Sequence, residues 1–330
     1  MQALFDRLPG EVVALKDAQS TLKEMWNMNQ EVGPCLSQRP DFRAMQMNLI
    51  LQLGSKLRAE EGLASFSQAI DFSCAHPCRI LVLCPCEPSE THLLLQAKLF
   101  SQCYIGRGTK NMSCCDAIIL NYSEAENDFL EHQVSIWLDN DLPTHHWVRG
   151  VEASRLQKEY FNCLSICNKI LYDSALEEEA YKTIQWPPGA SVQDFCYLRT
   201  LQARQALGFH LGAYPPSLIV KDLKAVHCSF PPSFKQEAAY CVDWIRDALK
   251  GCFELSKTQN SLSYTTQASP EGDTFSLVFE YKSSAYFRFS YDIKSGSGQI
   301  EAQLDENKRY HPLEIYTLSP EQILSQAIFH

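Results

Sequence analysis

Apolar side chains along the first two thirds of the chain follow two different periods. They recur at every second position from Met45 to Leu51 and predict a strand over 44–53. A continuous apolar run at 79–84 is typical of a strand that is buried on both faces. We expect further strands at 93–105, 117–120, 144–148 and 169–172, and helices at 57–70, 128–138, 155–167 and 194–210. Strands that alternate with helices in this way predict an α/β sheet with helices on its faces.

The last third of the chain has a different pattern. Apolar residues at helical spacing from Phe234 to Cys252 predict a long helix, and Ser233 with Gln236 has the form of a capping box at its start. Alternating aromatic residues then predict antiparallel strands near 275–281, 287–291 and 300–304, and Ser319-Pro320 begins a final helix. This order indicates a smaller α+β domain that consists of a helix, an antiparallel meander and a helix.

The length of the chain, 330 residues, is that of two domains rather than one. The proline pairs Pro215-Pro216 and Pro231-Pro232 predict a junction between the two patterns. We therefore expect an N-terminal α/β domain over 1–215 and a C-terminal α+β domain over 216–330.

Charge and hydropathy exclude several classes of partner. The formal net charge is -10, and a general nucleic-acid binder needs a basic stripe that this chain lacks. No apolar run approaches the roughly 18 residues that span a bilayer, so no membrane partner is expected. The first residues lack a basic segment followed by an apolar one, and this favours a cytoplasmic protein without a secretory signal.

The chain contains fourteen cysteines, which a cytoplasmic location keeps mostly reduced. Cys74, His76 and Cys78, followed by Cys84-Pro-Cys86, resemble a zinc cluster at first sight. An intervening strand at 79–84 would keep these groups apart, so we expect no metal. Most of the cysteines lie on predicted core faces. Four of them stay as redox candidates: Cys84, Cys86, Cys114 and Cys115.

No motif in the chain predicts catalysis. Gly106-Arg-Gly108-Thr-Lys110 lacks the spacing of a phosphate-binding loop and reads as a hairpin turn, with Arg107 and Lys110 as a weak anion site. The acidic run Glu177-Glu-Glu179 reads as a solvated helix face. The residues therefore favour a binding or regulatory protein that is not an enzyme and needs no cofactor.

Several segments resemble one protein family. They are MNLIL at 47–51, HPCRILVL at 76–83, LDNDLPTHHW at 138–147 and KILYDS at 169–174, followed by Asp194, Tyr197, Arg199 and Arg204. Their order and spacing resemble the OpcA-type glucose-6-phosphate dehydrogenase assembly proteins over about 40–215. Tyr197 and Ala203 stand where the family has tryptophans, and Trp147 stands where it has two.

The resemblance implies a non-catalytic partner of glucose-6-phosphate dehydrogenase in the oxidative pentose phosphate pathway. Such an assembly factor acts as an allosteric activator by binding and stabilising the active oligomer. Aromatic and arginine side chains dominate binding hot spots. We therefore assign Trp147, Arg149, Tyr197, Arg199 and Arg204 to the partner surface. In the alternative interpretation, Trp147 and Tyr197 belong to the core and the arginines pair locally.

Two other functions stay open at this point. The first is an enzyme or sensor that binds a sugar phosphate through Arg107, Lys110 and their neighbours. The second is a redox regulator that acts through cysteines such as Cys84 and Cys86.

Overall fold

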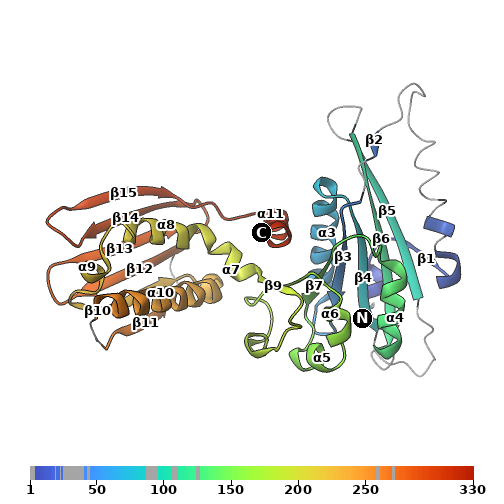
Figure 1. The fold of residues 1–330 in the computed structure, drawn as a ribbon. Coiled ribbons are helices and arrows are strands. Elements are labelled where there is room, and N and C mark those ends of the chain that lie inside the picture. The colour runs from blue at the N-terminus through green and yellow to red at the C-terminus, as the bar shows by residue number, and fades with distance from the viewer. Residues whose placement is uncertain are drawn as a thin grey trace. The chain divides into compact units, whose positions relative to one another are not determined.

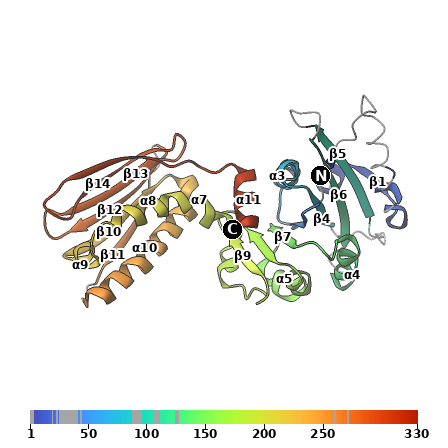
Figure 2. The ribbon, with the colours of Figure 1, turned by 45° about the horizontal axis from the view of Figure 1, so that its top comes forward.

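The computed structural model consists of two compact units (Figures 1 and 2). The residues that it describes are 4–18, 20–22, 24, 41–42, 45–86, 96–105, 111–123, 127–257, 261–269 and 272–330. Unit 1 comprises Met1–Phe195 together with Pro320–His330, and unit 2 comprises Cys196–Ser319. The chain thus leaves unit 1 once and returns to it for the last helix.

Unit 1 is built on a nine-stranded sheet. Its strands are β1 (Glu11–Val13), β2 (Asp41–Phe42), β3 (Met47–Leu53), β4 (Cys78–Cys86), β5 (Gln96–Ile105), β6 (Asn111–Ser123), β7 (Thr144–Arg149), β8 (Lys169–Tyr172) and β9 (Ser191–Asp194). Their order is β1-β5-β6-β4-β3-β7-β8-β9, and β2 pairs with β6. Strand β5 is antiparallel to both of its neighbours, whereas the other pairs are parallel.

The parallel strands of unit 1 have the order of a doubly wound sheet. Taken along the chain, β3, β4 and β6 extend the sheet in one direction, and β7, β8 and β9 extend it in the other. This is the order 3-2-1-4-5-6, which reverses between β3 and β7. In sheets of this kind, ligands bind outside the carboxyl ends of the strands at the point of reversal.

Helices cover both faces of this sheet (Figure 1). They are α1 (Leu4–Arg7), α3 (Ala59–Ala75), α4 (Asn127–Trp137), α5 (Ala153–Lys158), α6 (Phe161–Ser165) and α11 (Pro320–Phe329), with short 3₁₀ turns at Leu15–Asp17 and Glu179–Thr183. Residues of α4, α5 and α6 share one apolar core with Ile50, Leu81 and Leu120 of the sheet. Helix α11 packs on α3 and buries Leu324 and Ala327.

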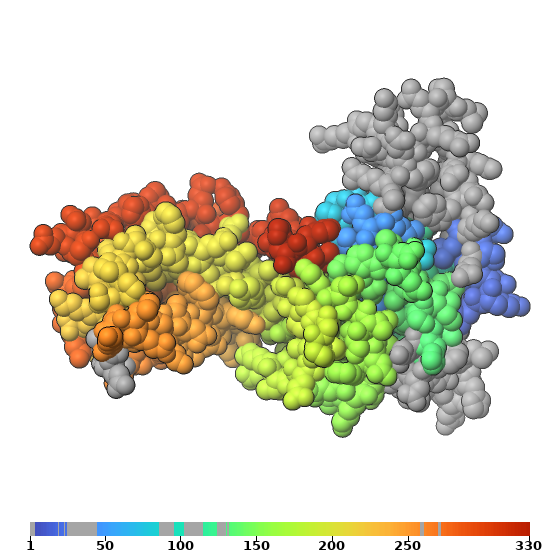
Figure 3. Space-filling view, in the orientation of Figure 1, coloured from blue at the N-terminus to red at the C-terminus, as the bar shows by residue number. Residues whose placement is uncertain are grey.

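Unit 2 is a six-stranded sheet with helices against one face. The elements are α7 (Phe195–Arg199), α8 (Leu201–Leu211), α9 (Pro216–Val220), β10 (Leu223–Phe230), α10 (Lys235–Ser256), β11 (Ser263–Ala268), β12 (Thr274–Tyr281), β13 (Tyr286–Asp292), β14 (Ser297–Gln303) and β15 (Arg309–Glu314). The strand order is β11-β10-β12-β13-β14-β15, and only the β10–β11 pair is parallel. Figure 3 shows α8 and α10, in yellow and orange, side by side on one face of this unit.

The predicted fold class is confirmed: an α/β unit is followed by a smaller unit with a largely antiparallel sheet. The division between the units lies before α8, whereas the sequence suggested a junction at 215/216. The reason is that Ala203 and Leu207 of α8 are buried in the core of unit 2.

Three helix predictions need correction. The single helix expected at 194–210 is two helices, α7 and α8, which follow the strand β9 directly. The single helix expected at 155–167 is two short helices, α5 and α6. The capping box expected at the start of α10 does not form, because a 3₁₀ turn at Pro232–Phe234 precedes the helix and Phe234 is its N-cap. No helix in the described parts of the chain has the length and apolar character needed to cross a membrane.

Candidate functional site

Trp147, which the sequence assigned to the partner surface, belongs to the core. It lies on β7, is 0% exposed, and its ring centroid is 5.6 Å from that of Phe195. The strand β7 is paired with a parallel strand on each side, so its side chains point into packed faces of the sheet. The surface assignment of Trp147 is therefore corrected.

Arg149 ends β7 and is also largely buried. Its Nη1 donates to Ser65 Oγ at 3.2 Å, and its Nε lies 3.4 Å from Glu177 Oε1. This arginine is committed to partners inside unit 1 and presents little of its side chain to a partner protein.

Tyr197, Arg199 and Arg204 connect the first helices of unit 2. The Arg204 guanidinium stacks on the Tyr197 ring, and its Nη2 donates to the Tyr197 carbonyl oxygen at 2.9 Å. Arg199 Nε donates to Glu237 Oε1 of α10 at 2.7 Å. Arg204 is buried, whereas Tyr197 is 41% exposed. The arginines therefore pair locally, and Tyr197 is the member of this group that presents surface.

The redox candidates divide into two buried thiols and two residues whose side chains lie outside the described structure. Cys84 on β4 and Cys115 on β6 are both buried. Burial raises the pKa of the Cys115 thiol to about 12, which disfavours the reactive thiolate. The side chains of Cys86 and Cys114 are not described, and neither is the segment with Arg107 and Lys110. Among the described residues, no group of His, Cys, Asp and Glu could hold a metal ion.

A pocket of about 360 Å³ lies where the strand order of unit 1 reverses. The loops that follow β3, β7 and β8 form it. Its lining residues are Lys56, Leu57, Arg58, Glu61, Arg149, Gly150, Val151, Leu176, Glu177 and Glu178. Arg149 is the one residue of this lining that the sequence pattern placed on a functional surface.

Two glycines allow the loops of this pocket to approach each other. Gly54 N donates to Arg149 O at 2.7 Å, and a Cβ atom on Gly54 would lie 1.9 Å from the carbonyl oxygen of Gly150. Gly150 itself has a φ of +64°, in the left-handed region that favours glycine. The backbone of the β7–α5 loop is thereby turned into the pocket.

The carboxylates of Glu177 and Glu178 bind this loop. Both oxygens of Glu177 accept the Gly150 N–H at 3.0 Å, and Glu178 Oε1 accepts the Ala153 N–H at 2.6 Å. Glu178 Oε2 also lies 3.0 Å from Lys56 Nζ. The Glu177 side chain is only 4% exposed, and burial raises its pKa above the ordinary value. The expectation of a solvated acidic helix face at 177–179 is therefore wrong for Glu177.

The position and fold of this pocket imply a dinucleotide, but its residues do not fit one. In the glycine-rich turn of a dinucleotide site, the second glycine lets the backbone approach the pyrophosphate. Here Gly54, Lys56 and Ala59 occupy the three positions of that motif, so a lysine replaces the second glycine. The Arg58 N–H before α3 already donates to Glu61 Oε2 at 3.0 Å. Three glutamates in the lining would further repel a pyrophosphate.

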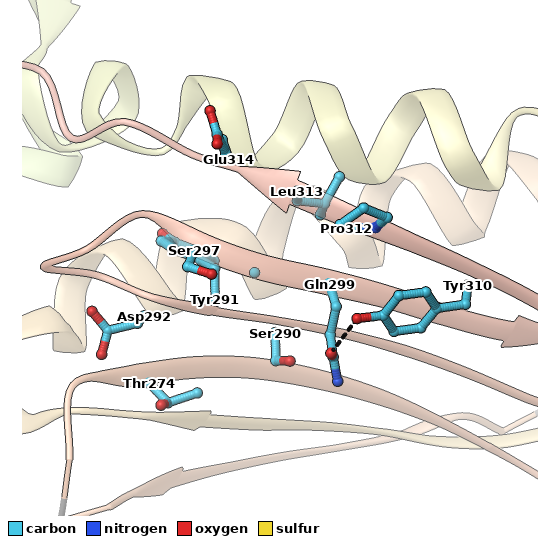
Figure 4. A pocket seen from close by; sticks show the side chains of 11 residues that line it. Thr274, Ser290, Tyr291, Asp292, Ser297, Gln299, Tyr310, Pro312, Leu313 and Glu314 are labelled. Carbon is cyan, nitrogen blue, oxygen red and sulfur yellow. Dashed lines mark hydrogen bonds between the residues drawn. The ribbon is translucent and has the colours of Figure 1, made fainter.

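A second hollow, of about 620 Å³, lies on the outer face of the sheet in unit 2 (Figure 4). It crosses β12 to β15, and hydroxyl, amide and carboxyl side chains line it. Tyr310 Oη donates to Gln299 Oε1 at 3.1 Å, and Gln299 Nε2 donates to Glu301 Oε1 at 3.3 Å. These polar groups thus bind one another, and the hollow gathers no set of side chains with an evident chemistry.

Part of unit 1 matches a known protein family. Residues 69–185 match the OpcA-type glucose-6-phosphate dehydrogenase assembly model, which is described as a glucose-6-phosphate dehydrogenase subunit N-terminal domain. The matched segment begins within α3 and includes Arg149, Glu177 and Glu178. The resemblance seen in the sequence is confirmed over this segment. No curated protein matches the chain.

Several solved structures resemble the chain distantly. One is KijD10, a 3-ketoreductase from Actinomadura kijaniata in complex with NADP and TDP-benzene. It has 10% identity and a TM-score of 0.43 over 86% of this chain and 89% of that chain. Another is an aldose-aldose oxidoreductase from Caulobacter crescentus complexed with glycerol, with 10% identity and a TM-score of 0.37 over 86% and 88%. At these scores the likenesses carry no functional argument.

Proposed function

Because the chain carries a domain of the OpcA-type glucose-6-phosphate dehydrogenase assembly family, we propose that it is a non-catalytic partner of that enzyme. It binds glucose-6-phosphate dehydrogenase in the cytoplasm, stabilises the active oligomer and so acts as an allosteric activator in the oxidative pentose phosphate pathway. The family match over 69–185 is the observation that carries this proposal.

The pocket at the strand reversal supports the non-catalytic part of the proposal. A dehydrogenase built on a doubly wound sheet would hold its dinucleotide there. In this chain Lys56 replaces the second glycine of the motif, and carboxylates bind the backbone N–H groups of Arg58, Gly150 and Ala153. The hydride chemistry therefore belongs to the partner enzyme in this proposal.

Activation without catalysis requires a difference in affinity. A protein that binds the active oligomer more tightly than the inactive form shifts the equilibrium between them by the ratio of the two affinities. Coupling free energies of this kind are typically about 1–3 kcal/mol, which corresponds to changes of roughly 5- to 150-fold. Such a protein changes the activity of the enzyme and the proportion of its oligomers together.

Helices α4 and α6 provide a candidate surface for the enzyme. These helices pack against each other and lie within the matched segment. Ile136 on α4 is 56% exposed, and Ile166 at the end of α6 is 49% exposed. The core of a protein interface is more apolar than the rest of the surface, so these two side chains are the ones to test. We assign this surface to the dehydrogenase.

Mixing the purified protein with the glucose-6-phosphate dehydrogenase of its own organism tests the proposal. We expect a change in the activity of the enzyme or in its KM for substrate. The double variant Ile136→Asp/Ile166→Asp should reduce this effect at least tenfold. Leu255→Asp is the control, because Leu255 lies on α10 of unit 2 and is even more exposed, at 75%, than the two isoleucines.

The experiment tests two claims separately: that the enzyme is the partner, and that the α4–α6 surface binds it. If the wild-type protein changes neither activity nor KM, the assembly proposal fails. If the wild type and the double variant change the activity or KM equally, the enzyme is still the partner, but it does not bind through the α4–α6 surface.

A further inference from the structure

Two consecutive glutamates in unit 1 are held in the same way. Glu177 binds the Gly150 N–H and lies beside the Arg149 guanidinium, with 3.4 Å between Nε and Oε1. Glu178 binds the Ala153 N–H and the Lys56 ammonium, at 2.6 Å and 3.0 Å. Each carboxylate thus has one backbone N–H and one cation as its partners.

This combination of partners is the chemistry of a phosphate site. Backbone N–H groups and cationic side chains together bind phosphate oxygens in loops at the carboxyl ends of parallel strands. Because Gly150 has a positive φ and no side chain, its N–H can face an anion in the pocket. Lys56 and Arg149 approach the same loop from the ends of β3 and β7.

We infer that the loop 150–153, with Lys56 and Arg149, is a receptor for two adjacent anionic groups that Glu177 and Glu178 of the same chain occupy. A diphosphate has the matching chemistry, because it also presents two adjacent anionic groups. The chain thereby fills, with its own carboxylates, one side of the crevice at which a doubly wound sheet binds its ligands.

The charge of the lining supports this inference. Lys56, Arg58 and Arg149 carry the positive charges, and Glu61, Glu177 and Glu178 carry an equal number of negative ones. With all six groups ionised, the pocket has no excess positive charge with which to bind an external anion. Removal of the two glutamates would leave Arg149 and two backbone N–H groups without these carboxylates, and Lys56 would keep only Glu152, whose Oε1 lies 3.3 Å from its Nζ.

Titration calorimetry with inorganic pyrophosphate, in the absence of divalent metal, tests the inference on the full-length protein. The double variant Glu177→Ala/Glu178→Ala should bind pyrophosphate at least tenfold more tightly than the wild type. Glu179→Ala is the matched control, because Glu179 belongs to the same acidic run and its side chain is 87% exposed. The control should bind no better than the wild type.

A further variant shows where the anion binds. Adding Lys56→Gln to the double variant should reduce pyrophosphate binding again, by roughly tenfold if the ammonium contacts the anion. Wild-type protein that binds pyrophosphate as tightly as the double variant would overturn the inference. A folded double variant that binds none would also overturn it.

The test does not depend on the stability of the double variant. If the double variant fails to fold, the single variant Glu178→Ala tests the inference in its place. Glu178 is less buried than Glu177, and its loss leaves the contact of Glu177 with Gly150 in place. Pyrophosphate should then raise the melting temperature of Glu178→Ala and leave that of Glu179→Ala unchanged. Equal changes in the melting temperatures of the two variants would refute the inference. None of these results involves the dehydrogenase, so the proposed function is tested separately.

Discussion

The guanidinium of Arg204 lies over the ring of Tyr197, 3.6 Å from the ring centroid. Both residues lie beyond the segment 69–185 that matches the assembly family. The guanidinium is buried, and it also donates to the Tyr197 carbonyl oxygen and to Thr200 Oγ1. This contact therefore joins α7 to α8, and the buried arginine serves the fold.

Replacement of Tyr197 by tryptophan should stabilise unit 2. Tryptophan is the best aromatic partner for a cation, and desolvated cation–π contacts contribute up to about 2 kcal/mol. We expect Tyr197→Trp to raise the free energy of unfolding slightly and Tyr197→Leu to lower it by about 1 kcal/mol. Urea unfolding measures both changes. The exposed contact between Arg288 and Tyr286 is the control, and Tyr286→Leu should cost less. If Tyr197→Leu and Tyr286→Leu lowered the free energy of unfolding equally, the prediction would be contradicted.

His146 should make the protein sensitive to acid. It is fully buried on β7, its Nε2 lies 2.8 Å from Gln52 Oε1, and burial lowers the pKa of the imidazole to about 3. The folded state therefore holds it neutral, whereas the unfolded chain protonates it near its ordinary pKa of about 6.5. Its contribution to stability is complete above pH 6.5 and is lost as the pH falls toward 3.

Urea unfolding at pH 7 and pH 5 tests this contribution. The linkage predicts that His146 accounts for up to about 2 kcal/mol of the loss over this interval. His146→Gln should therefore lose less stability than the wild type between the two pH values. The partly exposed His227 supplies the control variant His227→Gln, which should follow the wild type more closely. A His146→Gln variant with the pH dependence of the wild type would contradict the prediction.

Helix α11 should stabilise unit 1, although it follows unit 2 in the chain. Leu324 is fully buried where α11 packs on α3, and Gln68 Nε2 of α3 donates to Pro320 O at 2.7 Å. We expect Leu324→Ala to cost about 2–5 kcal/mol and to increase hydrogen exchange in α3. Leu255→Ala, at an exposed site, should change stability by less than about 0.5 kcal/mol. Faster exchange in unit 2 with α3 unchanged would disagree with this assignment of α11.

Cys115 should be inert in the folded protein. It is buried on β6, and burial keeps its thiol protonated up to a pKa of about 12. Iodoacetamide at pH 8, followed by mass mapping, should label the half-buried Cys252 much faster than Cys115. Rapid labelling of Cys115 in native protein would favour the redox hypothesis.

The elements of the fold that depend on local pattern were predictable. The strands β3, β4, β7 and β8 and the helix α10 carry clear local patterns, either a period or a short apolar run, and each lies close to its predicted range. The start of α10 was mispredicted because the proline pair before it forms a 3₁₀ turn in place of a capping box. The helix expected at 155–167 divides because the chain bends at Tyr160, between α5 and α6.

The pocket at the strand reversal was not predictable, because it depends on contacts between distant residues. Glu177 binds Gly150, and Lys56 binds Glu178, across many residues of sequence. When only the sequence is known, the acidic residues 177–179 have no visible partners, and their pattern is that of an exposed helix face. Trp147 was misassigned for a related reason: an aromatic residue on a strand shows its exposure only when the neighbouring strands are known.

The mass of the dehydrogenase in solution tests the central claim most directly. Sedimentation velocity of the organism's glucose-6-phosphate dehydrogenase, with and without a molar excess of this protein, measures binding and assembly in one experiment. We predict a complex heavier than either protein alone, a larger fraction of the active oligomer, and loss of both effects in Ile136→Asp/Ile166→Asp but not in Leu255→Asp. Two species that sediment independently, with the oligomer distribution of the enzyme unchanged at every ratio, would contradict the claim.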